Sequence, residues 1–126
     1  MKIVRNVTLC SLLVLCSFAV LGCGQEADET RPIADVQAEA DKMSADDLRS
    51  MAMKYKEAIV AKKGDFEKVT AKLKEIPLAD KLGEEAKGLS ADIKELNESI
   101  SALKERFDIY YGKLKSAGGD LSGLQI

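Results

Sequence analysis

The sequence predicts an all-α protein: a long antiparallel helical hairpin of the coiled-coil type, with a short helical segment before it. Two stretches place apolar residues at alternating spacings of four and three, which is the repeat of a coiled-coil seam. Pro77 separates the stretches and allows the chain to fold back. Charged residues make up 32% of the 126 residues, and Trp and His are absent, which is typical of long helices. This length fits one small domain.

The first 22 residues have the anatomy of a signal peptide. Lys2 and Arg5 form a basic start, and residues 7–21 form an uncharged, largely apolar run followed by small residues. This run is shorter than the roughly 20 residues that a helix needs to cross a bilayer. A permanent transmembrane span is therefore the weaker interpretation.

The run ends in Val20-Leu21-Gly22-Cys23, which resembles the lipobox of bacterial lipoproteins. The resemblance implies diacylglyceryl transfer to the Cys23 sulfur, cleavage between Gly22 and Cys23, and acylation of the new amine. Several acyl chains would anchor the protein on a membrane, because each buried methylene contributes about 0.8 kcal/mol. Gly24 follows the cysteine, and by the same resemblance the absence of Asp there implies the outer membrane, facing the periplasm, in a host with two membranes.

An ordinary secretory signal peptide with a cysteine at its border is the alternative interpretation. Cys10 and Cys16 lie inside the apolar run and would leave with it, so Cys23 would be the only thiol of the processed chain. A lone exported thiol favours modification of that residue.

A flexible tether and then an ordered helical region are predicted after Cys23. Residues 24–31 carry three acids and no hydrophobic residue larger than Ala, so residues 23–31 are expected to form the lipidated end and its tether. Pro32 suits a first helical turn, and apolar residues recur at helical spacing up to Met43. Ser44 and the acids after it predict a fresh start, so the first helix spans about 32 or 44 to 76.

Two seams of similar length define the expected hairpin, which spans residues 32–117. The first seam comprises Leu48, Ala52, Tyr55, Ile59, Lys62, Phe66, Val69, Leu73 and Ile76. The second comprises Leu82, Ala86, Leu89, Ile93, Leu96, Ile100, Leu103, Phe107, Tyr110 and Leu114. Residues 77–80 are the expected turn, with Asp80 placed to cap a second helix over about 80–117 and Gly118 after its end.

The seams also predict a register, because antiparallel partners have residue numbers with a nearly constant sum. The expected turn sets that sum at 158 or 159, which pairs Ile59 with Ile100 and the small Ala52 with the large Phe107. At about 1.5 Å per residue each helix would be about 50 Å long. A two-helix rod buries only a narrow stripe, so we expect added stability from a homo-oligomer or an envelope protein partner.

Several segments beside the seams have more than one interpretation. Met51, Met53 and Ala58 either broaden the first seam towards a third helix or remain partly exposed. Lys62 stands within the seam, and we expect its stem to pack while its ammonium group reaches water. The tail, residues 118–126, either docks on the rod, offers an apolar peptide to a partner, or is disordered.

A possible ligand patch involves three neighbouring residues of the second helix. Arg106, Tyr110 and Tyr111 could form an aromatic and cationic surface, but packing of core and flank explains them more simply.

Composition argues against catalysis and against nucleic-acid binding. The chain lacks His, a Gly-rich phosphate loop and a Ser-centred elbow, so we expect no enzyme, cofactor or metal site. Because residues 1–22 hold Lys2, Arg5 and no acid, the processed chain would carry 17 basic and 21 acidic residues, a net charge of −4. A mildly acidic chain is not expected to bind nucleic acid.

The expected function is that of a small lipid-anchored protein of the cell envelope. It would act as a structural spacer or a protein-interaction module, attached to the membrane through lipid on Cys23. An adaptor or chaperone-like hairpin that binds an exported client is the alternative, and a small-ligand binder is the least favoured class.

Overall fold

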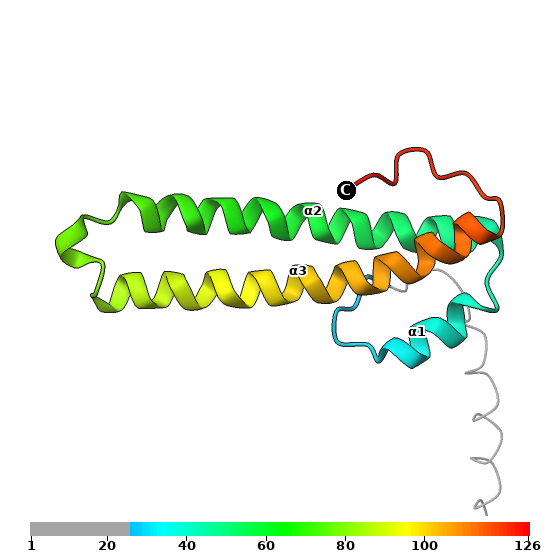
Figure 1. Cartoon of the computed structure of the whole chain (residues 1–126), viewed down its shortest axis with the longest axis horizontal. Helices are drawn as coiled ribbons and strands as arrows, with labels where there is room; N and C mark the ends of the chain where they lie inside the picture. The colour runs from blue at the N-terminus through cyan, green and yellow to red at the C-terminus, as the bar shows by residue number, and fades with distance from the viewer. Residues whose placement is uncertain (1–25) are drawn as a thin grey trace, which may run out of the picture.

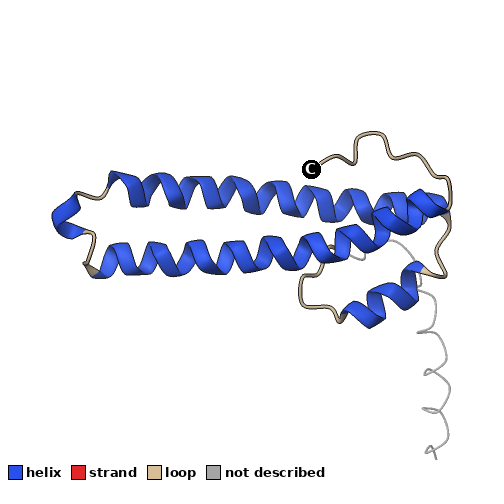
Figure 2. Ribbon diagram, viewed as in Figure 1, coloured by secondary structure: helices blue, strands red, loops and turns tan. Residues whose placement is uncertain are grey.

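A computed structural model describes residues 26–126 and contains four helical elements. They are α1 (Ile33–Ala40), α2 (Ala45–Glu75), the short 3-10 helix η1 (Leu78–Asp80) and α3 (Glu84–Ser116) (Figures 1 and 2). The long helices α2 and α3 lie side by side and antiparallel, with η1 at the far end of the pair, and no strand occurs in residues 26–126. The predicted all-α hairpin is confirmed. The predicted signal peptide, residues 1–22, and Cys23 lie outside the described residues.

The restart predicted at Ser44 is present. Ser44 is the N-cap of α2, and its hydroxyl accepts a hydrogen bond from the Asp47 backbone N–H at 3.2 Å. Asp46 and Asp47 lie in the first turn, where the helix dipole favours negative charge. The region from residue 32 to residue 76 therefore forms two separate helices, and the first of them, α1, ends at Ala40.

The connection between α2 and α3 is longer than the predicted turn at 77–80. Asp80 N–H donates to the Pro77 carbonyl at 2.9 Å, and Gly83 N–H donates to the Asp80 carbonyl at 2.8 Å. These bonds form a 3-10 helix, so the chain needs residues 76–83 to reverse direction. Asp80 does not cap α3, whose N-cap is Gly83, and the predicted helix start at residue 80 is corrected to Glu84.

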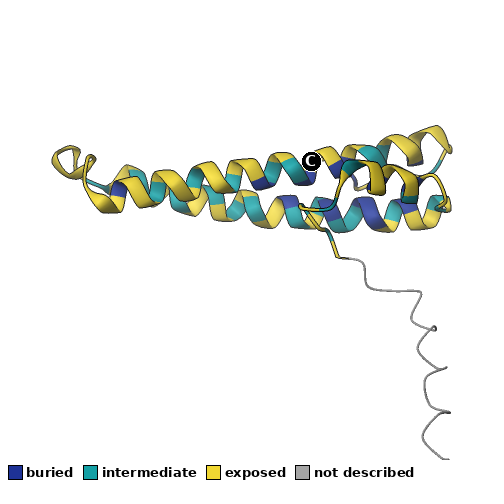
Figure 3. Ribbon diagram, turned by 90° about the horizontal axis from the view of Figure 1, so that it is seen from below, coloured by how far each residue is buried: buried dark blue, intermediate teal, exposed yellow. Residues whose placement is uncertain are grey.

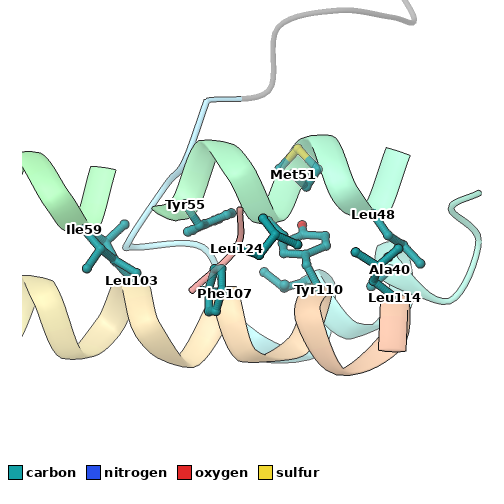
Figure 4. Packing of buried hydrophobic residues seen from close by; sticks show 12 residues of the cluster. Ala40, Leu48, Met51, Tyr55, Ile59, Leu103, Phe107, Tyr110, Leu114 and Leu124 are labelled. Carbon is teal, nitrogen blue, oxygen red and sulfur yellow. The ribbon is translucent and has the colours of Figure 1, made fainter. Parts of the chain in front are cut away.

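The longer connection changes the pairing of the two helices by one layer of the seam. Ile59 points towards Leu103 (Figure 4), whereas the predicted register paired Ile59 with Ile100. Leu82 falls within the connection and is 86% exposed, so its assignment to the seam is wrong. A four-three repeat looks the same after a shift of one layer, and for this reason spacing alone did not fix the register.

Burial divides the hairpin into two parts (Figure 3). We call residues 60–98 the arm and the other described residues the base. All the buried hydrophobic residues except Ala86 belong to the base. Apart from the exposed Leu82, the other seam residues of the arm are only half-buried; they are Lys62, Phe66, Val69, Leu73, Ile76, Leu89, Ile93 and Leu96.

The residues that flank the first seam explain this division. Met51 and Ala58 lie one heptad apart on the same flank of α2, where Met51 is buried and Ala58 packs against the core. The next positions at this spacing are Asp65 and Lys72. A third layer of chain can bury apolar surface against Met51 and Ala58. Over Asp65 and Lys72 the same layer would have to remove charged side chains from water, which is costly.

The helix α1 supplies part of this third layer by packing against α3. Val36 and Ala40 are its buried residues, at 0% and 2% exposure, and both join the core cluster. Asp41, just after α1, pairs with the Lys113 ammonium group of α3. Thus α1 attaches to the last turns of the hairpin.

The C-terminal tail supplies another part and returns along α2 (Figure 1). Its Leu124 is 1% exposed and belongs to the core cluster. The Arg49 guanidinium donates to the backbone carbonyls of Asp120, at 2.7 Å, and Ser122, at 3.0 Å. Gly118 has a φ of +70°, a conformation that favours glycine and that turns the chain after α3. Of the three interpretations of the tail, docking is the one observed.

Candidate functional site

The segment before α1 is attached to the hairpin, so the expectation of a flexible tether is wrong for residues 26–31, which we call the strap. The Tyr55 hydroxyl on α2 holds Asp28 in two ways. It accepts from the Asp28 backbone N–H at 3.3 Å and donates to the Asp28 carbonyl at 3.1 Å. One side chain of α2 therefore satisfies both backbone groups of one strap residue.

Side chains of α3 hold the strap from the other side. The Ser99 hydroxyl donates to the Glu29 carboxylate, and the Arg106 guanidinium donates to the Arg31 carbonyl, at 2.9 Å from Nε. Ser99 and Arg106 are each only 7% exposed. Buried polar groups are costly unless they are hydrogen-bonded, so the strap supplies acceptors that these two side chains need.

Lys62 of α2 adds an ion pair to the strap. Its ammonium nitrogen lies 3.8 Å from a Glu29 carboxylate oxygen, and both side chains are more than a third exposed. The ammonium group of Lys62 is predicted to reach water; its side chain is 39% exposed, and the ammonium group lies beside the Glu29 carboxylate. Such a partly exposed pair contributes little to stability, on the order of 0–1 kcal/mol.

A local turn shapes the strap. The Thr30 hydroxyl and backbone N–H both donate to the Asp28 carboxylate, at 2.7 Å and 2.8 Å. These hydrogen bonds favour the charged carboxylate and lower the pKa of Asp28. The strap therefore leaves the hairpin towards α1 through a defined turn.

The sequence contains a signal for the strap that the prediction of a flexible tether did not use. Tyr55 and Lys62 are one heptad apart on α2, and Ser99 and Arg106 are one heptad apart on α3, so each pair presents polar groups along one line. Of the three residues of the possible ligand patch, Arg106 binds the strap carbonyl of Arg31, and the Tyr111 ring stacks on Phe107 with centroids 5.5 Å apart.

Two open cavities accompany these contacts. The larger, of about 660 Å³, lies between residues 26–29 of the strap and the side chains of Ala58, Lys62 and Leu103. The smaller, of about 270 Å³, lies on the arm and is lined by Lys62, Val69, Asp92, Glu95 and Leu96. Within residues 26–126 no group of three or more His, Cys, Asp or Glu side chains is placed to hold a metal ion.

The tip of the arm presents two apolar side chains to solvent. Leu78 and Leu82 are 83% and 86% exposed. The hydrogen bonds of η1 order this loop, and a Cβ added at Gly83 would lie 3.0 Å from the Asp80 carbonyl oxygen. The leucines are therefore carried by a defined turn.

The predicted anchor residue, Cys23, precedes the strap and lies outside the described residues. In the part of the chain that the structure covers, none of the helices combines the length and the apolar character required to cross a membrane. Comparison of the chain with protein-family models, with curated protein sequences and with solved structures found no match.

Proposed function

We propose that this chain is a small envelope lipoprotein, anchored by lipid on Cys23, that acts as a protein-interaction module with the arm as its binding part. The observation that carries the proposal is the division of the hairpin. The base is covered by α1, the strap and the tail, whereas the seam of the arm is half-buried and its tip is exposed. The arm is therefore the part with apolar surface left to bury against a partner.

The chemistry of the tip favours a protein partner over a lipid surface. Burial of a leucine side chain yields about 1.5–3 kcal/mol, a gain that the exposed Leu78 and Leu82 do not obtain within this chain. Three acids, Asp80, Glu84 and Glu85, stand near them against one base, Lys81, and this net negative charge opposes insertion into an anionic membrane. An apolar pocket in another envelope protein suits this combination. The arm also serves as a spacer, since α2 would be about 46 Å long.

Mass spectrometry combined with cross-linking in native membranes tests this proposal. We expect the protein to begin at an acylated Cys23 and a photoreactive group at position 79 to capture an envelope protein. The Leu78→Ser and Leu82→Ser double variant should lose that adduct, and the control Val60→Ser, at a residue 53% exposed and away from the tip, should retain it. An intact, unacylated chain, or adducts unaffected by the double variant, would refute the proposal.

The half-buried seam of the arm supports a second candidate function, that of an adaptor or chaperone for an exported client. A client could enter between α2 and α3 near Val69 and Leu96, where the smaller cavity lies. Hydrogen exchange separates the two candidates. Client-dependent protection of residues 64–96 favours the adaptor, and unchanged protection favours an arm that binds through its tip.

A further inference from the structure

We infer that the strap makes the lipid anchor hold the hairpin beside Tyr55, about a third of the way along α2 from its N-terminal end, and not by the end of the rod. This inference rests on the proposed function, because it requires lipid on Cys23. The motivating contacts are those of the Tyr55 hydroxyl with the backbone of Asp28, which fix that residue on α2.

The length of chain before Asp28 limits the height of the molecule. Cys23 precedes Asp28 by five residues, and an extended chain covers at most about 18 Å in five residues. From Tyr55 to Ile76, α2 rises about 32 Å. Ile76, at the end of α2, can therefore stand no more than about 50 Å from the lipid surface while the strap is bound. Ala79 at the tip lies three residues further, so its limit is about 61 Å.

Release of the strap would lengthen the free chain. The next docked element is α1, which packs on α3 through Val36 and begins at Ile33. The chain from Cys23 to Ile33 is ten residues long, and it reaches about 36 Å when extended. The tip would then gain up to about 18 Å of height, because the strap halves the number of residues between Cys23 and the first docked residue.

The chemistry of the strap makes it separable from the core. Ala27 is the strap residue that packs against the core cluster. The remaining attachment consists of hydrogen bonds and two ion pairs, Glu29 with Lys62 of α2 and Arg31 with Glu39 of α1.

Removal of the Tyr55 hydroxyl and the Glu29 carboxylate should therefore free residues 26–30 and leave α2 and α3 folded, while the Arg106 guanidinium still holds the Arg31 carbonyl. The ring of Tyr55, which is buried, is retained in Tyr55→Phe.

The test uses the full-length protein, purified with its lipid and placed in phosphatidylcholine vesicles. A donor dye is attached to an Ala79→Cys variant at the tip, and an acceptor dye is placed at the outer lipid surface. Glu29→Ala with Tyr55→Phe is the strap variant. Glu26→Ala with Tyr111→Phe makes the same changes in composition outside these contacts and serves as the matched control.

We expect the parent and the control to keep all donor-to-surface distances within about 61 Å and the strap variant, in which Arg31 stays bound, to extend them by up to about 11 Å. Amide exchange in residues 26–30 should be at least about tenfold faster in the strap variant, with circular dichroism showing unchanged helix content. If mass spectrometry shows that Cys23 is acylated and the distances are equal in all three proteins, the strap inference alone is overturned. A Cys23 without acyl chains would overturn the proposed function and this inference together.

Discussion

Tyr55 and Tyr110 stack across the two long helices in the base, with ring centroids 5.5 Å apart and ring planes 27° apart (Figure 4). Their hydroxyl groups differ in one respect. The Tyr55 hydroxyl bonds to the backbone of Asp28, whereas the Tyr110 hydroxyl is buried and has no hydrogen-bond partner within residues 26–126. The strap thus satisfies one hydroxyl of the pair, and the other destabilises the fold because it is desolvated without compensation.

Replacement of Tyr110 by Phe is expected to stabilise the protein. Loss of a buried, unpaired hydroxyl removes a desolvation penalty of about 1–3 kcal/mol, so the free energy of unfolding should rise by about 1 kcal/mol. Urea denaturation followed by circular dichroism measures this change. The matched variant Tyr55→Phe removes a bonded hydroxyl and should lower stability by about 0.5–1.5 kcal/mol. Equal losses in the two variants would contradict the assignment.

Stability is expected to fall at alkaline pH because of Tyr110. Burial of the hydroxyl, followed by the proximity of Tyr55, raises the pKa of Tyr110 above its ordinary value of 10.0. Above pH 10 the unfolded chain loses this proton while the folded protein keeps it, so the folded state binds more protons and stability decreases with rising pH. Below pH 10 the contribution is constant. Urea melts from pH 8 to 11.5 should show the decrease, and it should be smaller in Tyr110→Phe; parallel curves would count against it.

The division into base and arm predicts unequal costs for the same substitution. Leu103→Ala removes a side chain that is 2% exposed and should lower stability by about 2–5 kcal/mol. Leu96→Ala acts on a half-buried position of the arm and should cost about half as much or less. Chemical denaturation of both variants provides the comparison. Costs of similar size would mean that the arm is as well packed as the base.

Deletion of the tail should destabilise the base. Loss of residues 120–126 removes Leu124, which is 1% exposed, together with the carbonyls that Arg49 binds. Burial of one leucine contributes about 1.5–3 kcal/mol, and in a domain of this size each kcal/mol changes the melting temperature by roughly 4–8 °C. Deletion of residues 125–126 alone is the control and should have a small effect, since Ile126 is 44% exposed. Equal melting temperatures would show that docking of the tail adds no stability.

The strap illustrates why composition gave the wrong expectation for residues 26–31. The expectation of flexibility rested on the lack of large apolar side chains, and that lack is real. Order comes instead from polar partners, because Ser99 and Arg106 are buried and need acceptors that Glu29 and Arg31 supply. The heptad spacing of Ser99 and Arg106 indicates a polar line on α3, but it does not say which segment of chain lies over it.

Local chemistry in the sequence determined the helices themselves. The four-three spacing produced α2 and α3, Ser44 set the start of α2, and Pro77 separated the two long helices. Tertiary structure alone decided the register, the coverage of the base and the position of the strap. The repeat is unchanged by a shift of one layer, so only the folded connection of residues 76–83 selects Leu103 as the neighbour of Ile59. The base is covered by segments that are distant in the sequence. These segments bury apolar surface or satisfy buried polar groups only once the whole chain has folded.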